Sequence, residues 1–206
     1  DINIRQLASS GVKDIIIAVG YLGELIQNAI GDGSKYGLTI KYSYEDSPLG
    51  TVGGLSLILD SLKNDFFVMN GDILHNLNFN SLFSQHISNQ ADITITTYKQ
   101  THNIRLGVLE VEQEKIISYT EKPSKNFIVS IGVYAIKKNA IENYVRTKEY
   151  LDFPNLINKM IKKDKDIFSY MHNGLWKDLG TTEDYIDITD KLKEIKETYP
   201  EIPIIL

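Results

Sequence analysis

Two aspartates stand where a metal ion and a phosphate could meet. Asp72 follows an apolar, strand-like segment in the stretch VMNGDI, and Asp178 lies between Trp176 and Gly180, just before a helical pattern. A carboxylate at the carboxyl end of a strand offers Mg²⁺ the oxygen ligand that it prefers, at the edge of a sheet where nucleotide phosphates bind. Taken alone, however, an N-G-D turn or an acidic residue before a helix is commonly structural.

A glycine-rich turn, EDSPLGTVGGL, runs from Glu45 to Leu55 between two apolar segments. Its three glycines permit close approaches that a Cβ would forbid, and it leads into a helical pattern whose first amides carry partial positive charge. These features suit a nucleotide or anion cradle, although the spacing matches neither G-x-G-x-x-G nor a P-loop. Without other evidence, an ordinary strand-to-helix turn is the simpler interpretation.

A third pattern, YTEKPSK, places Glu121 and Lys122 at the end of a strand, just before Pro123. The pair offers an acceptor for hydroxyl groups beside a donor for phosphate, but such residues are more often a solvated strand end. The four histidines are His75, His86, His102 and His172. Their spacing along the chain does not match that of zinc ligands, and we expect them on the surface or in loops.

The elements that would position these residues alternate along the first half of the chain. Apolar runs of strand length occupy 14–20, 38–44 and 66–70, and helical patterns follow them at 22–31, 53–62 and 79–87. Strands separated by helices indicate parallel pairing with crossover connections. The runs DIIIAV and DFFVM are apolar at consecutive positions, which predicts central strands covered on both faces, with ligands at their carboxyl ends.

The second half adds segments with a period of two, at 92–98, 106–122 and 127–136, broken by polar residues at 112–115. This alternation predicts antiparallel strands and a hairpin. The sequence therefore predicts an α/β fold, with a Rossmann-like, mixed, mostly parallel sheet flanked by helices. A first helix should end at Gly11, with no strand before it, and a last helix should begin at Thr181.

Composition limits the function classes. The chain has 206 residues, a formal net charge of -5 and no cysteine. It is long enough for one well-cored domain, has no basic run suited to nucleic acid, and has no disulfide framework or thiolate zinc site. Because neither a leader nor a long apolar run is present, we expect a single domain over 1–206 in the cytoplasm, without membrane contact.

Taken together and in this order, the glycine turn, the N-G-D, the E-K-P and the W-x-D-x-G resemble the sugar-1-phosphate nucleotidyltransferases. The resemblance covers nearly the whole chain, from GVKDIIIAVGYLGELI to WKDLGTTEDY. It implies the nucleotide-diphospho-sugar transferase fold and an in-line attack by a sugar-1-phosphate on the α-phosphate of an NTP, releasing pyrophosphate. Such a reaction needs a metal and cations that neutralise and align the crowded phosphates, with Mg²⁺ as the implied cofactor.

The resemblance also implies a role for particular residues. Asp72 and Asp178 would hold Mg²⁺ and act with Lys122, which would contact the phosphate of the sugar. The sugar itself would contact Gly107, Glu121 and Ser130. The nucleotide would lie along the glycine turn and the N-G-D, at Glu45, Leu49, Gly50, Thr51 and Gly71.

The chain also departs from the family pattern. Members of the family open with a strand and a glycine-rich loop that ends in arginine, followed by a lysine-proline pair, and this sequence contains no such segment. The loop cradles the triphosphate, so we expect the chain by itself to be nearly inactive. The stretch IRLGV lacks the proline-aromatic pair that often precedes this glycine in members of the family. Ser130 also occupies a position where the family usually has asparagine. The identity of the sugar is therefore left open.

Guanine presents two adjacent donors that a carboxylate can accept in bidentate fashion, whereas uracil and thymine present only one ring N–H. Glu45 therefore favours GTP, with UTP or dTTP as alternatives. Two other classes of function remain open: a non-catalytic sugar-nucleotide-binding regulatory protein, and a metal-dependent glycosyltransferase. Glycosyltransferases carry Asp-x-Asp at the metal, and the corresponding place here reads Asn70-Gly71-Asp72.

Overall fold

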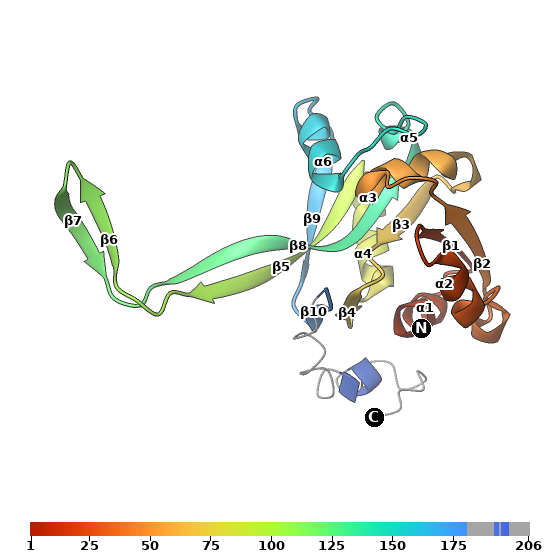
Figure 1. The fold of residues 1–206 in the computed structure, drawn as a ribbon, viewed down its shortest axis with the longest axis horizontal. Helices are drawn as coiled ribbons and strands as arrows, with labels where there is room; N and C mark the ends of the chain where they lie inside the picture. Colours follow the sequence, from red (N-terminus) through yellow and green to blue (C-terminus); the bar gives the residue numbers. More distant parts are fainter. Residues whose placement is uncertain (181–191, 194, 198–206) are drawn as a thin grey trace.

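The computed structural model of the protein describes residues 1–180, 192–193 and 195–197. Figure 1 shows an α/β body from which a long two-stranded ribbon projects. Most of the helix predicted from Thr181 onward lies outside the described residues. No helix in the described part of the chain is long and apolar enough to cross a membrane.

The chain begins with a β–α–β unit, as the alternating pattern predicts. Its elements are α1 (Ile2–Ser9), β1 (Asp14–Val19), α2 (Gly23–Ile30), a 3-10 turn η1 (Ser34–Tyr36) and β2 (Thr39–Tyr44). β1 and β2 pair in parallel. Helix α1 ends at Ser9, and the predicted glycine follows its C-cap residue Ser10: Gly11 has φ +90°, and its N–H donates to the carbonyl of Ala8 at 3.0 Å.

The main sheet has the strand order β3-β8-β5-β9. These strands are β3 (Asp65–Met69), β5 (Ile93–Asn103), β8 (Ser124–Lys137) and β9 (Ile167–His172). β5 and β9 pair in parallel, whereas β8 is antiparallel to both β3 and β5. The connecting helices are α4 (Phe79–Ser88), α5 (Lys138–Ile141) and α6 (Phe153–Ile161). The sheet is therefore mixed, as predicted, with two antiparallel pairings and one parallel pairing, and helices flank it (Figure 1).

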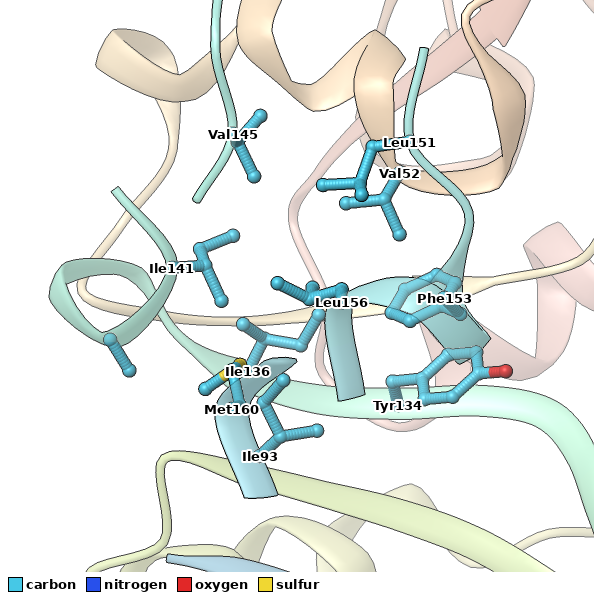
Figure 2. Packing of buried hydrophobic residues seen from close by; sticks show 11 residues of the cluster. Val52, Ile93, Tyr134, Ile136, Ile141, Val145, Leu151, Phe153, Leu156 and Met160 are labelled. Carbon is cyan, nitrogen blue, oxygen red and sulfur yellow. The ribbon is translucent and has the colours of Figure 1, made fainter. Parts of the chain in front are cut away.

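The second half of strand β8 is covered on both faces. Tyr134 and Ile136 pack into one apolar cluster with α6, whereas Val133 and Ala135 pack into a second cluster with α4. Figure 2 shows the first cluster, in which Phe153 lies over Tyr134. The alternation follows from the period of two in a strand, and it makes β8 the anchor for elements on either side.

Three expectations are corrected. β1 and β3 were predicted to be covered on both faces, but most of their residues are only half-buried, since among the described residues each pairs along one edge. The helix predicted over 53–62 is instead a short α3 (Gly50–Gly53) followed by 3-10 turns η2 (Gly54–Leu57) and η3 (Leu59–Ser61). Adjacent glycines explain the break, because glycine is a weak helix former. Three of the four histidines are buried: His75, His86 and His172.

The projecting ribbon begins where β5 and β8 run on beyond the sheet. Their pairing continues to Asn103 opposite Ser124, and a hairpin of β6 (Val108–Glu112) and β7 (Lys115–Thr120) follows. The hairpin turns at Gln113 and Glu114, whose φ values of 47° and 67° suit a tight two-residue turn. The predicted antiparallel hairpin is thus confirmed.

Candidate active site

Two short strands bring Asp72 and Asp178 together. β4 (Ile73–His75) and β10 (Trp176–Asp178) pair in antiparallel fashion, with Asp178 opposite Ile73. The N–H of Leu179 donates to the main-chain carbonyl of Asp72 at 2.9 Å. Both aspartates are exposed, and Asp178 Oδ1 accepts the N–H of Gly180 at 3.1 Å. The two carboxylates therefore share one edge of the fold, although they are far apart in sequence.

Helix α1 fixes the turn that carries Asp72. The Asn3 side-chain amide donates to the carbonyls of Gly71 at 3.4 Å and Ile73 at 3.0 Å. The buried Gln6 amide donates to the carbonyl of His75 at 2.6 Å. These bonds give partners to main-chain carbonyls on either side of Asp72, and the donors come from α1 rather than from β4 or β10. Helix α1 therefore holds the turn that carries Asp72 in place.

The Ser130 to Gly132 segment of β8 meets the same edge. The N–H of Asn70 donates to the carbonyl of Gly132 at 2.9 Å. Gly132 has φ +77°, and a Cβ there would lie 2.8 Å from the Asn70 side chain. Glycine is therefore required for this approach. Ser130 is exposed, its hydroxyl donates to that of Tyr134 at 3.2 Å, and it lies on β8 two residues before the Gly132 contact.

Glu45 is folded back over the glycine turn. Its Oε2 accepts the N–H of the buried Leu49 at 3.1 Å, and its other carboxylate oxygen lies where a Cβ on Gly54 would be. Gly50 has φ +78°, and Thr51 makes hydrogen bonds to a distant segment around Asp152. The predicted nucleotide residues of this turn thus form one structured unit, in which Glu45 holds the turn.

The remaining predicted residues lie on the ribbon. A Cβ on Gly107 would collide with the Tyr119 hydroxyl, which donates to Glu121 Oε2 at 2.9 Å. Lys122 has φ 45° and its ammonium lies 3.8 Å from Glu121 Oε1. The structure brings these residues to one another, but Figure 1 shows the β6–β7 end of the ribbon away from β4 and β10. It does not bring Lys122 to Asp72 and Asp178, because β5 and β8 stay paired well beyond the sheet.

The donor set at the aspartate edge fits a magnesium ion that is shared with a ligand. No group of three or more His, Cys, Asp or Glu side chains within the described residues is arranged to hold a metal by itself. Two exposed carboxylates are hard oxygen donors, and Mg²⁺ usually keeps several waters and binds through one or two carboxylates together with substrate phosphates. Asp72 and Asp178 therefore suit Mg²⁺ in the presence of a nucleotide.

Comparison with known proteins identifies the family to which this chain belongs. The model of the nucleotidyl transferase family matches residues 1–195, and the chain belongs to that family. The chain resembles HddC from Yersinia pseudotuberculosis in complex with GMP-PN, with a TM-score of 0.70 and 21% identity, over 92% of this chain and 83% of that one. A putative glucose-1-phosphate thymidylyltransferase from Bacillus anthracis gives a TM-score of 0.68 at 18% identity, over 98% and 82%. These structures share the nucleotide-diphospho-sugar transferase fold that the sequence predicts.

Two relatives identified by sequence carry names of the same kind of enzyme. Mannose-1-phosphate guanylyltransferase from Mycobacterium tuberculosis is 29% identical over 193 residues, which cover 89% of this chain and 52% of the relative. Mannose-1-phosphate guanyltransferase from Saccharomyces cerevisiae is 32% identical over 199 residues, which cover 90% and 54%. The chain thus spans about half the length of these relatives.

Several residues that shape the site were not predicted from the sequence. Asn3 and Gln6 hold the Asp72 turn, and Asp152 and Tyr134 contact Thr51 and Ser130 respectively. Asp152 stands before Phe153 and Pro154, a pattern that marks a helix start and suggests a cap rather than a site residue. Nothing local in the sequence indicates the contacts that these residues make.

Proposed function

We propose that the protein transfers a nucleotidyl group from an NTP to a sugar-1-phosphate, giving an NDP-sugar and pyrophosphate. The observation that carries the proposal is the β4–β10 pair, which joins Asp72 and Asp178 beside the Ser130 to Gly132 segment. The names of the relatives, mannose-1-phosphate guanylyltransferases, support the same reaction. A regulatory protein that binds sugar nucleotides without turnover would not need two carboxylates placed together in this way.

The residues of this chain would align two anions that repel each other. Asp72 and Asp178 would hold Mg²⁺, which supplies positive charge to the phosphates during the displacement. The glycine turn would hold the nucleotide, and Ser130 would orient the sugar. Lys122, assigned to the sugar phosphate, is exposed near the hairpin, so this role requires the ribbon to approach the aspartate edge.

GTP is the proposed nucleotide, because the relatives are named as guanylyltransferases and Glu45 offers a carboxylate at the turn. Replacement Glu45→Gln should lower the preference for GTP over UTP by about tenfold, since glutamine cannot accept both guanine donors. The glutamine oxygen can still accept the N–H of Leu49, so the turn keeps its shape. Ratios of kcat/KM for the two nucleotides measure the change; an unaltered ratio would leave Glu45 with the turn-holding role alone.

The function is tested by pyrophosphate release from the full-length protein with Mg²⁺. The assay runs five NTPs against hexose-, hexosamine- and heptose-1-phosphates. Release with one nucleotide and one sugar class would establish the reaction and name both substrates. Binding of an NDP-sugar without release in any combination would favour the regulatory alternative, and sugar transfer from an NDP-sugar to an acceptor would favour the glycosyltransferase.

A further inference from the structure

A second segment is hydrogen-bonded to the middle of the glycine turn, at residues 49–53. Leu151 provides three main-chain hydrogen bonds: its N–H donates to the carbonyl of Leu49 at 2.9 Å, and its own carbonyl accepts from Val52 at 2.9 Å and Gly53 at 3.0 Å. Figure 2 shows Leu151 beside Val52. We call residues 148–153 the clamp segment. It fixes the backbone of the turn that is assigned to the nucleotide.

Asp152 supplies the side-chain part of this contact. Its Oδ1 accepts the N–H of Thr51 at 2.9 Å and the Thr51 hydroxyl at 3.2 Å. Its Oδ2 accepts the hydroxyl of Tyr150 at 2.6 Å. The N–H of Phe153 in turn donates to Thr51 Oγ1 at 2.9 Å. The bonds that the two carboxylate oxygens accept lower the pKa of Asp152, with the Tyr150 hydroxyl as the main cause and the Thr51 amide next.

Asp152 makes these bonds in place of the usual ones for its position. It is the N-cap residue of α6, yet its side chain makes no capping hydrogen bond. Aspartate at an N-cap ordinarily accepts an amide of its own helix, which stabilises that helix. Here both carboxylate oxygens are used by other partners, and one of them serves the turn. Helix stability therefore does not account for the orientation of this side chain.

The glycines of the turn leave no space between the turn and the clamp segment. A Cβ on Gly50 would lie 2.7 Å from the carbonyl oxygen of Leu151, and a Cβ on Gly53 would lie 2.5 Å from that of Glu149. Main-chain atoms cannot yield as a flexible side chain would. The pliable stretch of sequence is thus held in one conformation by direct contact between backbones.

The clamp segment is itself anchored to the central strand. The rings of Phe153 and Tyr134 are stacked, with centroids 3.7 Å apart and planes 5° apart (Figure 2). Both residues are buried, and Tyr134 belongs to β8. A stacked, buried aromatic pair resists displacement. The position of Asp152, next to Phe153, is therefore set by the core of the domain.

We propose that Asp152 is a positioning residue for nucleotide binding: through Thr51 it holds the glycine turn in the conformation that accepts the nucleotide. The inference rests on the proposed function for the identity of the ligand, whereas the clamp itself is a property of the fold. Asp152 acts by accepting hydrogen bonds, so its oxygen atoms matter more than its charge.

The test compares Asp152→Ala, Asp152→Asn and the matched control Glu149→Gln, whose exposed side chain lies in the same segment and pairs with Arg146. Amide hydrogen exchange of Thr51, Val52 and Gly53 should speed up by about tenfold or more in the alanine variant, because bonds that protect the turn are lost. The dissociation constant for a fluorescent GTP analogue with Mg²⁺ should rise by a similar factor. The asparagine variant should stay near wild type, since its amide oxygen can still accept from Thr51.

Two outcomes would overturn the proposal: unchanged exchange and affinity in the alanine variant, or equal losses in the control. If the alanine variant does not fold, Thr51→Val removes the hydroxyl alone and should give a smaller change in the same two measurements. A wild-type protein that binds no nucleotide would contradict the proposed function, while the exchange experiment would still decide whether Asp152 holds the turn. Normal activity in the wild type with no effect of Asp152→Ala would reject only the positioning role.

Discussion

Replacement of either aspartate, as Asp72→Asn or Asp178→Asn, should lower the kcat of pyrophosphate release by about a hundredfold or more. An amide has nearly the shape of a carboxylate but lacks the negative charge that a magnesium ion requires. The fold should be preserved, because the bond between Leu179 N–H and the Asp72 carbonyl involves only main-chain atoms. Steady-state assays of the full-length protein, with circular dichroism as a check on folding, measure the effect.

The double variant provides a sharper test of a shared ion. If both carboxylates act on one magnesium ion, replacing the second should cost little beyond the first, since residues that act as a unit are not additive. Asp60→Asn, at an exposed aspartate of η3, is the matched control and should keep wild-type activity. Either single variant with more than about half of the wild-type activity would contradict the assignment, because loss of a metal ligand has a far larger effect.

Local sequence patterns were sufficient to predict several of the helices and strands that position the site. The period of two around Tyr134 predicts a strand with different neighbours on its two faces, and β8 has them. The first β–α–β unit and the β6–β7 hairpin also follow from their sequences. In each case the signal and the structure span the same few residues, so tertiary contacts are not needed to predict it.

The contacts that organise the site are not local. Asp152 and Thr51 are separated by 101 residues, and the sequence around Asp152 indicates only a helix start. The three glycines likewise indicate only a turn that permits close approaches, whereas the structure shows which approaches are made: Gly50 and Gly53 lie against Leu151 and Glu149, and Gly54 lies against Glu45. The conformational propensity of a segment limits the backbone conformations that it can adopt. Contacts with residues distant in sequence determine which of these conformations the folded protein has.

The burial of the histidines likewise could not be predicted from the local sequence. His75 was expected at the surface, but it lies in β4 with no exposed area. Its neutral ring is well accommodated: Nδ1 accepts the N–H of Leu77 at 3.2 Å, Nε2 lies 3.4 Å from the sulfur of Met69, and Phe79 packs edge-on at 5.5 Å. Burial, with a smaller contribution from nearby His172, lowers the pKa of His75 to about 4.

The buried His75 should make the protein less stable in mild acid. Above pH 6.5 the ring is neutral in both the folded and the unfolded states, so it has no effect on the pH dependence. As the pH falls from 6.5 toward 4, His75 becomes protonated in the unfolded state but stays neutral in the folded state. The free energy of unfolding therefore decreases until the pH reaches the pKa of the folded state. One pH unit corresponds to about 1.4 kcal/mol, so the whole interval corresponds to about 3 kcal/mol.

Urea unfolding from pH 4 to 8 measures this loss, and the variant His75→Asn isolates it. Asparagine can still accept the N–H of Leu77 but does not titrate, so the difference between the two curves should shrink by about 3 kcal/mol from pH 7 to pH 4. The comparison removes the contribution of His86, whose pKa is also lowered by burial, because both proteins retain it. His102→Asn, at an exposed histidine of the ribbon, is the matched control for loss of an imidazole. Parallel curves for wild type and His75→Asn would mean that the folded protein takes up a proton on this ring at the same pH as the unfolded chain, so that the β4–β10 pair beside the aspartates tolerates a buried charge in acid.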